Sequence, residues 1–127
     1  MGSNNWRRDS LLVRRGEIRW VNLDPVVGSE SAKRRPGVVV SNDGANEVAT
    51  RLRRGVVTVV PVTSNVKHVY PFQVLLLAQE CGLMRDSKAQ AEQIRSVSVE
   101  RIGDQIGTVP ATVIEELDDA LRIHLDL

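Results

Sequence analysis

The segment from Gly28 to Pro36 contains the residue types in this chain that are best suited to chemistry. It reads Gly-Ser-Glu-Ser-Ala-Lys-Arg-Arg-Pro and lies between two predicted strands. Arginine binds phosphate well because its planar guanidinium donates two hydrogen bonds at once. Arg35 stands directly before Pro36, and a following proline restricts the backbone of the residue before it. Taken alone, the pattern makes Arg35 a candidate phosphate ligand, whereas most basic loops of this kind are simply solvated.

Positive charge is concentrated in the first half of the chain. The net charge is +1, but residues 1–67 carry +6 and residues 68–127 carry −5. Blocks of like charge suit a polyanion such as a nucleic-acid backbone, but charge alone favours a solvated surface without a partner. The aromatic residues are few (Trp6, Trp20, Tyr70 and Phe72), so a nucleic-acid site built on base stacking is not expected.

Several other kinds of catalytic site are not indicated. His68 lies in a polar loop and His124 in a predicted helix, and the chain has no HExxH, Walker or GxGxxG motif. The acidic residues lack metal-ligand spacing, so we expect neither a metal nor a cofactor. Cys81 is the single cysteine, which excludes an internal disulfide and a cysteine-based zinc site. We expect it to be a buried or inert thiol.

Hydrophobic patterning predicts short strands followed by one helix. Val113, Ile114, Leu117, Leu121 and Leu125 recur every three to four residues, which is typical of an amphipathic helix, and Pro110 suits its first turn. Residues 43–55 are predicted to be a polar excursion without a core face. These patterns predict five or six strands and a small, mostly antiparallel barrel closed by a helix. The strands are expected over 17–23, 37–40, 56–62, 70–77, 88–97 and 102–109.

The length of 127 residues predicts one domain, which we place over residues 14–127 after a flexible tail at 1–13. The first three residues, Met-Gly-Ser, have the form of an expression-tag remnant and are left out of the fold argument. No apolar run is long enough for a membrane span or a signal peptide. We therefore expect a cytoplasmic protein that does not bind a membrane.

Several segments together resemble the MazF/PemK family of toxin endoribonucleases, in family order and over about residues 14–127. One departure is Arg19, which stands where the family often has tryptophan, with Trp20 one residue later. The segments that carry the resemblance are RRGEIRWVNLDPVVGSE, KRRPGVVVSND, VTVVPVTSN, PFQVLL and AQAEQIRSVSVERI.

The resemblance implies an SH3-like barrel with a C-terminal helix, assembled as a homodimer. It also implies the toxin of a type II toxin–antitoxin system, which cleaves single-stranded RNA at specific sequences without a metal and so inhibits translation and growth. The 2′-hydroxyl of the substrate would attack the adjacent phosphorus and leave a 2′,3′-cyclic phosphate and a 5′-hydroxyl. The implied partner is a cognate antitoxin similar to MazE.

The resemblance also implies roles for individual residues. Arg35, Thr63 and Glu30 fall on the catalytic positions of the family. The loops 43–55 and 64–70 are expected to select bases, because loops on a rigid scaffold carry specificity. The residues expected to bind substrate are Ser29, Lys33, Arg34, Pro36, Arg53, Arg54, Gln93 and Arg95.

Alternatives stay open for several of these roles. Arg34 competes with Arg35, and the Thr63 hydroxyl could instead bond its own backbone at the strand end. The general base is open, because arginine hardly ever deprotonates and cations usually lower the pKa of a carboxyl such as that of Glu30. The same fold also serves toxins that poison DNA gyrase, and an adaptor that binds RNA without cutting it is a third possibility. The pairing of Arg35 with Thr63 favours the RNA-cleaving function.

Overall fold

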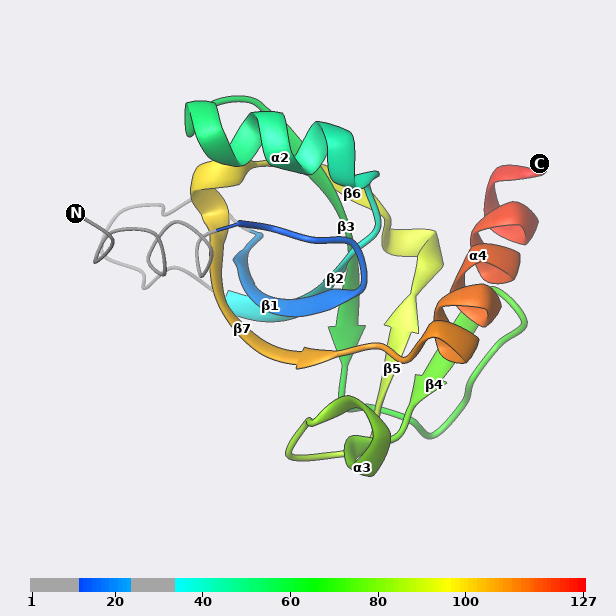
Figure 1. Ribbon diagram of the computed structural model, residues 1–127. Coiled ribbons are helices and arrows are strands. Elements are labelled where there is room, and N and C mark those ends of the chain that lie inside the picture. The colour runs from blue at the N-terminus through cyan, green and yellow to red at the C-terminus, as the bar shows by residue number, and fades with distance from the viewer. Residues whose placement is uncertain (1–11, 24–33) are drawn as a thin grey trace, which may run out of the picture.

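The computed structural model describes residues 12–23 and 34–127, which form a strongly curved sheet with helices packed around it (Figure 1). The strands are β1 (Glu17–Asn22), β2 (Arg34–Val39), β3 (Val56–Thr63), β4 (Gln73–Leu76), β5 (Ser87–Gln90), β6 (Arg95–Ser98) and β7 (Ile102–Thr108). The helices are α2 (Asp43–Leu52), α3 (Ala78–Cys81) and α4 (Ala111–Leu125), with 3-10 turns η2 (Ala91–Gln93) and η3 (Val99–Arg101).

All strand pairs are antiparallel, in the order β4-β5-β3-β2-β1-β7, with β6 paired to β3. The first half of β3 pairs with β6 and its last two residues pair with β5, so β3 joins two parts of the sheet. The predicted antiparallel barrel with a closing helix is confirmed. The prediction of five or six strands was one too low, because η2 divides the segment predicted as one strand over 88–97.

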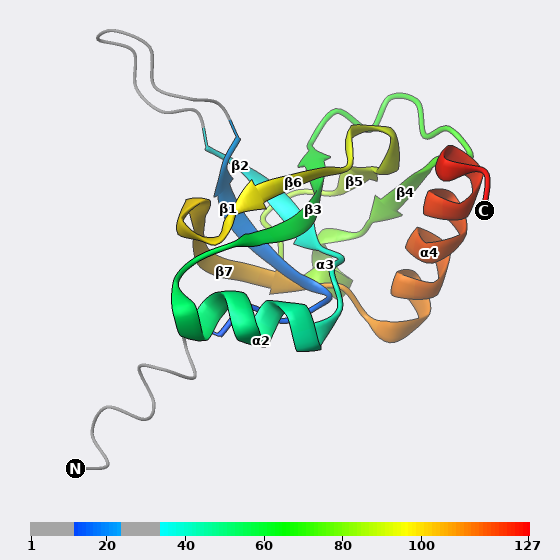
Figure 2. The ribbon, with the colours of Figure 1, turned by 90° about the horizontal axis from the view of Figure 1, so that it is seen from above.

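Two buried clusters lie on opposite faces of the sheet. The first lies under α4 and contains Ile18, Val38, Val60 and Leu117, all fully buried. The second lies inside the curve of the sheet and is built mainly from valines of β1, β2, β3 and β6. Alternate residues of β2 and β3 supply the two clusters because successive side chains of a strand point to opposite faces. Figure 2 shows α2 and α4 well separated, at different sides of the sheet.

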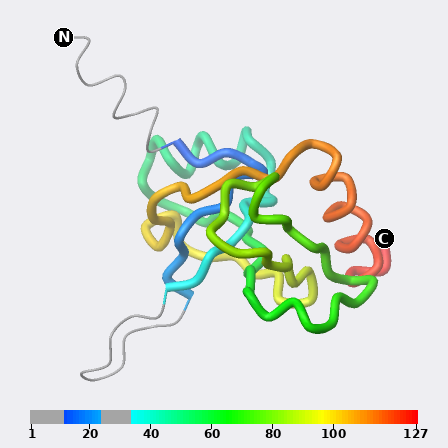
Figure 3. Tube along the Cα trace, turned by 90° about the horizontal axis from the view of Figure 1, so that it is seen from below, coloured from blue at the N-terminus to red at the C-terminus, as the bar shows by residue number. Residues whose placement is uncertain are grey.

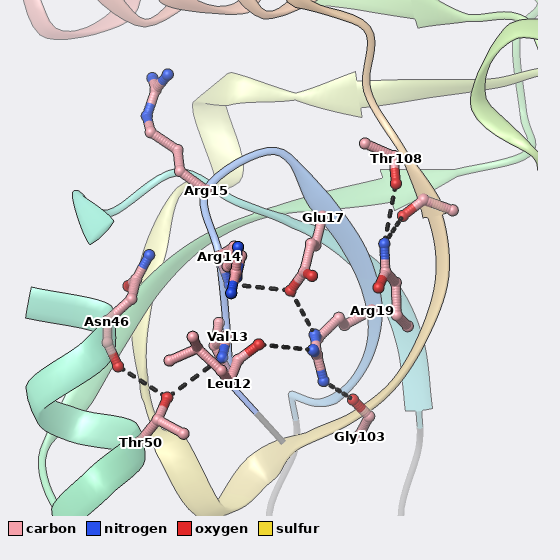
Figure 4. A network of polar contacts seen from close by, with 12 residues as sticks. Leu12, Val13, Arg14, Arg15, Glu17, Arg19, Asn46, Thr50, Gly103 and Thr108 are labelled. Carbon is pink, nitrogen blue, oxygen red and sulfur yellow. Dashed lines mark hydrogen bonds and ion pairs between the residues drawn. The ribbon is translucent and has the colours of Figure 1, made fainter. Parts of the chain in front are cut away.

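The segment before β1 is packed from Leu12 onward. Val13, one residue before the expected start of the domain, is buried in the second cluster. Residues 1–11 lie outside the described residues. The Arg19 side chain is 5% exposed and pairs with Glu17 at 2.9 Å. It also donates to the Gly103 carbonyl at 3.1 Å and to the Leu12 carbonyl at 3.1 Å (Figure 4). This network fastens the start of the domain to β1 and β7.

The prediction that residues 43–55 form a polar excursion was wrong, because Asp43–Leu52 form helix α2. Asn42 caps the helix by accepting a hydrogen bond from the Ala45 amide at 2.8 Å, and Arg53 ends it in a left-handed conformation. Only Asn46 and Ala49 are buried. Ala45, Val48, Ala49 and Leu52 do recur at helical spacing, but Val48 and Leu52 are more than half exposed, so this short apolar stripe is mostly left unburied.

The helix predicted at the C-terminus is confirmed as α4. It begins at Ala111, so Pro110 is the residue before the first turn rather than part of it, and the first turn contains no acidic residue. Arg122 and His124 lie in the last turn, where positive charge complements the helix dipole. Within the described residues, no helix combines the length and the apolar character needed to cross a membrane.

Candidate active site

The register of β1 and β2 separates Arg34 from Arg35. Val21 lies opposite Arg35, whereas Trp20 lies opposite Pro36 and Asn22 opposite Arg34. The Arg34 guanidinium stands 5.0 Å from the centre of the Trp20 ring, in a cation–π arrangement. Arg34 and Pro36 therefore share the Trp20 face, and Arg35 points to the other. The structure does not bring these two predicted substrate-binding residues together with Arg35.

Arg35 lines a cavity of about 330 Å³ at the end of the curved sheet, which we call the Arg35 cavity. Leu23, buried in the second cluster, forms part of its wall. Gln93 from η2 and Arg95 from β6 also line it, so three predicted residues from two segments far apart in the sequence share one cavity. The full lining is Leu23, Arg35, Pro61, Gln90, Gln93 and Arg95.

Thr63 stands at the end of β3, on the same side of the sheet as the cavity. The register pairs Gly37 with Pro61, and continuing it by two residues brings Arg35 opposite Thr63. The Thr63 hydroxyl oxygen accepts a hydrogen bond from the Asn65 amide at 3.2 Å. This is the local backbone bond that the sequence left open as an alternative role. It uses one lone pair of the oxygen and leaves the hydroxyl proton able to donate to a ligand.

Lys88 and Gln90 extend this polar face, and the sequence analysis did not select either of them. Lys88 pairs directly with Thr63, and Gln90 lines the Arg35 cavity from the same face of β5. The signal was present as the alternation of polar Lys88 and Gln90 with apolar Ala89 and Ala91. It was missed because the alternation was taken only as evidence for a strand, without asking which functional residues its polar face would meet.

Aromatic residues gather over this face, contrary to what their small number suggested. The Tyr70 and Phe72 rings stack with their centres 5.4 Å apart and their planes 5° apart, and His68 lies 6.2 Å from Tyr70. All three belong to the segment between β3 and β4, which Figure 3 shows running along the lower side of the molecule toward α4. Composition does not reveal such clustering, because the three residues are close in sequence but few in the whole chain.

Arg53 and Arg54, predicted to bind substrate, follow α2 and do not reach the Arg35 cavity. Arg53 lines a different hollow of about 710 Å³, together with residues of η3 and β7. The two cavities share no lining residue. Residues 43–52 form a helix rather than a loop, and α2 carries the arginines at its C-terminal end away from the Arg35 cavity. Their binding to substrate stays a prediction. Ser29, Glu30 and Lys33 lie outside the described residues.

Cys81 is buried, as expected, and takes no part in this site. Burial raises the pKa of its thiol above the usual value, and the Glu80 carboxylate raises it further. A thiol that stays protonated at neutral pH is a poor nucleophile, so the structure supports an inert role.

The family model for the PemK-like, MazF-like toxin of type II toxin–antitoxin systems matches residues 14–125. This chain belongs to that family. It is 62% identical over 116 residues to the endoribonuclease MazF9 of Mycobacterium tuberculosis, covering 91% of this chain and 98% of that protein. The family resemblance predicted from the sequence is thereby confirmed.

Solved structures agree with this assignment. The crystal structure of MazF from Deinococcus radiodurans matches with a TM-score of 0.72 and 31% identity, over 91% of this chain and 98% of that one. A MazE–MazF crystal structure from the same organism matches with a TM-score of 0.73 and 31% identity, over 91% and 97% of the two chains. The predicted fold is confirmed by both. These relatives support a toxin endoribonuclease, and none of them supports the gyrase alternative.

Proposed function

We propose that this chain is the toxin of a type II toxin–antitoxin system and cleaves single-stranded RNA at the Arg35 cavity. The observation that carries the proposal is the meeting of Arg35, Gln93 and Arg95 in one cavity beside Thr63. Two guanidinium groups at a small concave site suit a phosphodiester, which two parallel N–H donors bind in a bidentate manner. The reaction class, cleavage of RNA within the chain, comes from the relatives, which are named endoribonucleases.

The reaction we propose requires only groups of the substrate and of the protein. The 2′-hydroxyl oxygen forms a bond to the adjacent phosphorus, and the bond from phosphorus to the 5′ oxygen breaks. The 2′-hydroxyl proton passes to a base, for which Glu30 is the candidate, and the 5′ oxygen gains a proton. The products are a 2′,3′-cyclic phosphate and a 5′-hydroxyl.

Arg35 and Thr63 would act on the charge that develops at phosphorus. The five-coordinate intermediate carries more negative charge on its oxygens than the diester does, so donors fixed around it stabilise it preferentially. Arg35 would supply a charged pair of N–H donors. The proton that the leaving oxygen gains would come from solvent, because a guanidinium hardly ever gives up a proton. Thr63 would supply a neutral hydroxyl donor. Gln93 and Arg95 would hold the neighbouring nucleotides.

A cleavage assay tests this function. The purified protein is incubated with a long RNA in excess EDTA, and a DNA of the same sequence is treated in parallel. We expect discrete RNA fragments that end in cyclic phosphate, and intact DNA, because DNA lacks the 2′-hydroxyl nucleophile. Intact RNA, or cleavage that appears only after magnesium is restored, would contradict the proposal.

We also propose that the chain works as a homodimer in the cytoplasm and is inhibited by an antitoxin similar to MazE. Apolar side chains of α4 are exposed, among them Ile123 and Leu125. Figures 1 and 2 show α4 beside β4. A second copy of the chain would cover this surface, and the basic Arg35 cavity would attract an acidic inhibitor.

A further inference from the structure

We infer that Lys88 is a substrate-binding residue that holds an RNA phosphate next to Thr63, an inference that rests on the proposed endoribonuclease function. Lysine is rarely buried without a partner for its charge, because removing an ammonium from water costs free energy that only a paired or hydrogen-bonded site recovers. Lys88 is nevertheless only 7% exposed.

The ammonium group of Lys88 has few partners of its own. Its Nζ donates one hydrogen bond, at 2.5 Å, to the His68 carbonyl, and it stands 5.8 Å from the centre of the Tyr70 ring. No carboxylate among residues 12–23 and 34–127 forms an ion pair with it. An ammonium has three N–H donors, so this charge retains donors for an anionic ligand.

The place of Lys88 in the sheet identifies that ligand. Lys88 and Thr63 are direct cross-strand partners, which puts their Cβ atoms about 5 Å apart on one face. Pro61 lies two residues before Thr63 on β3, and Gln90 lies two residues after Lys88 on β5. Both line the Arg35 cavity on the same face of the sheet. A strand of RNA bound with one phosphate at Arg35 and Thr63 would therefore pass next to Lys88. The neighbouring phosphate is the anion that this cation is placed to receive.

The competing explanation is that Lys88 has a structural role only and holds the segment between β3 and β4 in place. The hydrogen bond to His68 fastens that segment, and its loss would disturb the Tyr70–Phe72 stack without any contact with RNA. The two roles differ in their dependence on salt. Each phosphate contact with single-stranded nucleic acid contributes about 0.7 to the slope of log affinity against log salt concentration, whereas a purely structural contact contributes nothing.

The test measures RNA binding by the variants Lys88→Met and Lys88→Arg. The cleavage site is first mapped with the wild-type protein on a long RNA. A short RNA with a 2′-deoxy sugar at that position then gives a ligand that binds without being cut. Met keeps the apolar stem without the charge, and Arg keeps the charge. Arg51→Met is the matched control, because Arg51 is a highly exposed cation on α2, far along the chain from this face.

We expect Lys88→Met to bind this RNA at least about tenfold more weakly, the usual effect of losing one charged hydrogen bond. Its salt slope should fall by about 0.7, while Lys88→Arg and Arg51→Met keep the wild-type slope. A Lys88→Met protein with an unchanged melting temperature and an unchanged slope would overturn the inference even if its activity is low. A wild-type protein that cuts no RNA would instead overturn the proposed function, and the inference with it.

Discussion

At the scale of single residues, Arg35 is the side chain on which the proposed chemistry depends most. Arg35→Ala should lower kcat/KM by about a hundredfold or more, the usual effect of removing a donor to the transition state. Arg35→Lys should also be poor, because an ammonium does not reproduce the two parallel N–H donors. Fragment yield from a mapped RNA, measured at several concentrations, gives these values.

Arg34→Ala is the matched control for this prediction. Arg34 stacks on Trp20 on the opposite face of β2, so its loss should weaken RNA binding slightly and leave kcat near the wild-type value. If Arg34→Ala loses cleavage while Arg35→Ala retains it, the active site has been placed on the wrong face of the sheet.

The buried pair of Arg19 and Glu17 gives a prediction about stability rather than activity. Arg19→Met leaves the Glu17 carboxylate, 14% exposed, without its cation, and breaking a buried pair in this way costs about 3 kcal/mol. The double variant Arg19→Met with Glu17→Leu should recover much of this loss, since no uncompensated charge remains. Urea unfolding followed by circular dichroism measures both. A single variant within about 1 kcal/mol of wild type would show that the pair is not effectively buried.

The predicted site residues that the structure brings together are those that a local motif marks. Arg35 before Pro36, and Gln93 with Arg95, are marked by their immediate neighbours, and the structure gathers them in one cavity. Lys88 could not be found in this way. Its position matters only because β5 pairs with the last two residues of β3, and a pairing between segments 25 residues apart is not visible in either segment.

At the scale of elements, the strands were predictable and α2 was not. The valine runs of β2 and β3 are strong strand signals because β-branched residues suit a pleated, buried surface. Helix α2 buries only a small face, and its helical spacing of Ala45, Val48, Ala49 and Leu52 is short and surrounded by polar residues. Asn42 as the cap, and Gly55 shortly after the end, were signals of a helix that the polar composition concealed.

The contact between α3 and β7 yields a prediction at this scale. A Cβ atom added at Gly107 would stand 2.3 Å from the Cys81 carbonyl oxygen, which is too close for the two elements to keep their present distance. Gly107→Ala should therefore push α3 away from β7, lower the melting temperature and expose the Cys81 thiol.

The reactivity of the Cys81 thiol measures this displacement of α3 from β7. Since Cys81 is the chain's single cysteine, its reaction with a disulfide reagent at pH 8 measures opening of α3 alone. We expect slow labelling of the wild-type protein and labelling at least about tenfold faster in Gly107→Ala, because exposure restores an ordinary thiol pKa. Gly44→Ala is the control, since the nearest atom to an added Cβ there is a side-chain oxygen of Asn42. Equal labelling rates in all three proteins would contradict the prediction.

At the scale of the whole molecule, we expect a symmetric dimer through the exposed apolar side chains of α4. Homodimers commonly use one self-complementary patch, and a stable interface of this kind buries about 1,600 Å² in total. Ile123→Glu should convert the protein to a monomer, because it places a charge among the exposed apolar side chains at the end of α4. Light scattering at micromolar concentration measures this. Met84→Glu is the control, since Met84 is fully exposed on the segment between α3 and β5. A wild-type monomer would contradict the prediction.

Inhibition by the antitoxin follows from the charge of the same molecule. Arg35 and Arg95 line the Arg35 cavity, and Lys88 lies next to Thr63 on the neighbouring strand. Because these side chains are positively charged, an inhibitor that blocks RNA binding should be acidic. It should also carry apolar anchors for the exposed Tyr70 and Leu75, and an extended segment that folds on binding fits this requirement. Because the contact is partly ionic, added salt should weaken it.

The experiment combines the protein with the product of the neighbouring small reading frame. We expect the two to co-purify, RNA cleavage to stop, and the uncut 2′-deoxy RNA to be displaced in proportion to the complex formed. Arg35→Ala should bind this partner more weakly than Arg51→Met does, since only Arg35 lies in the cavity that both ligands would share. If the two chains form no complex, or form one that still cuts RNA, inhibition does not act at this surface and control must operate on synthesis or degradation of the toxin instead.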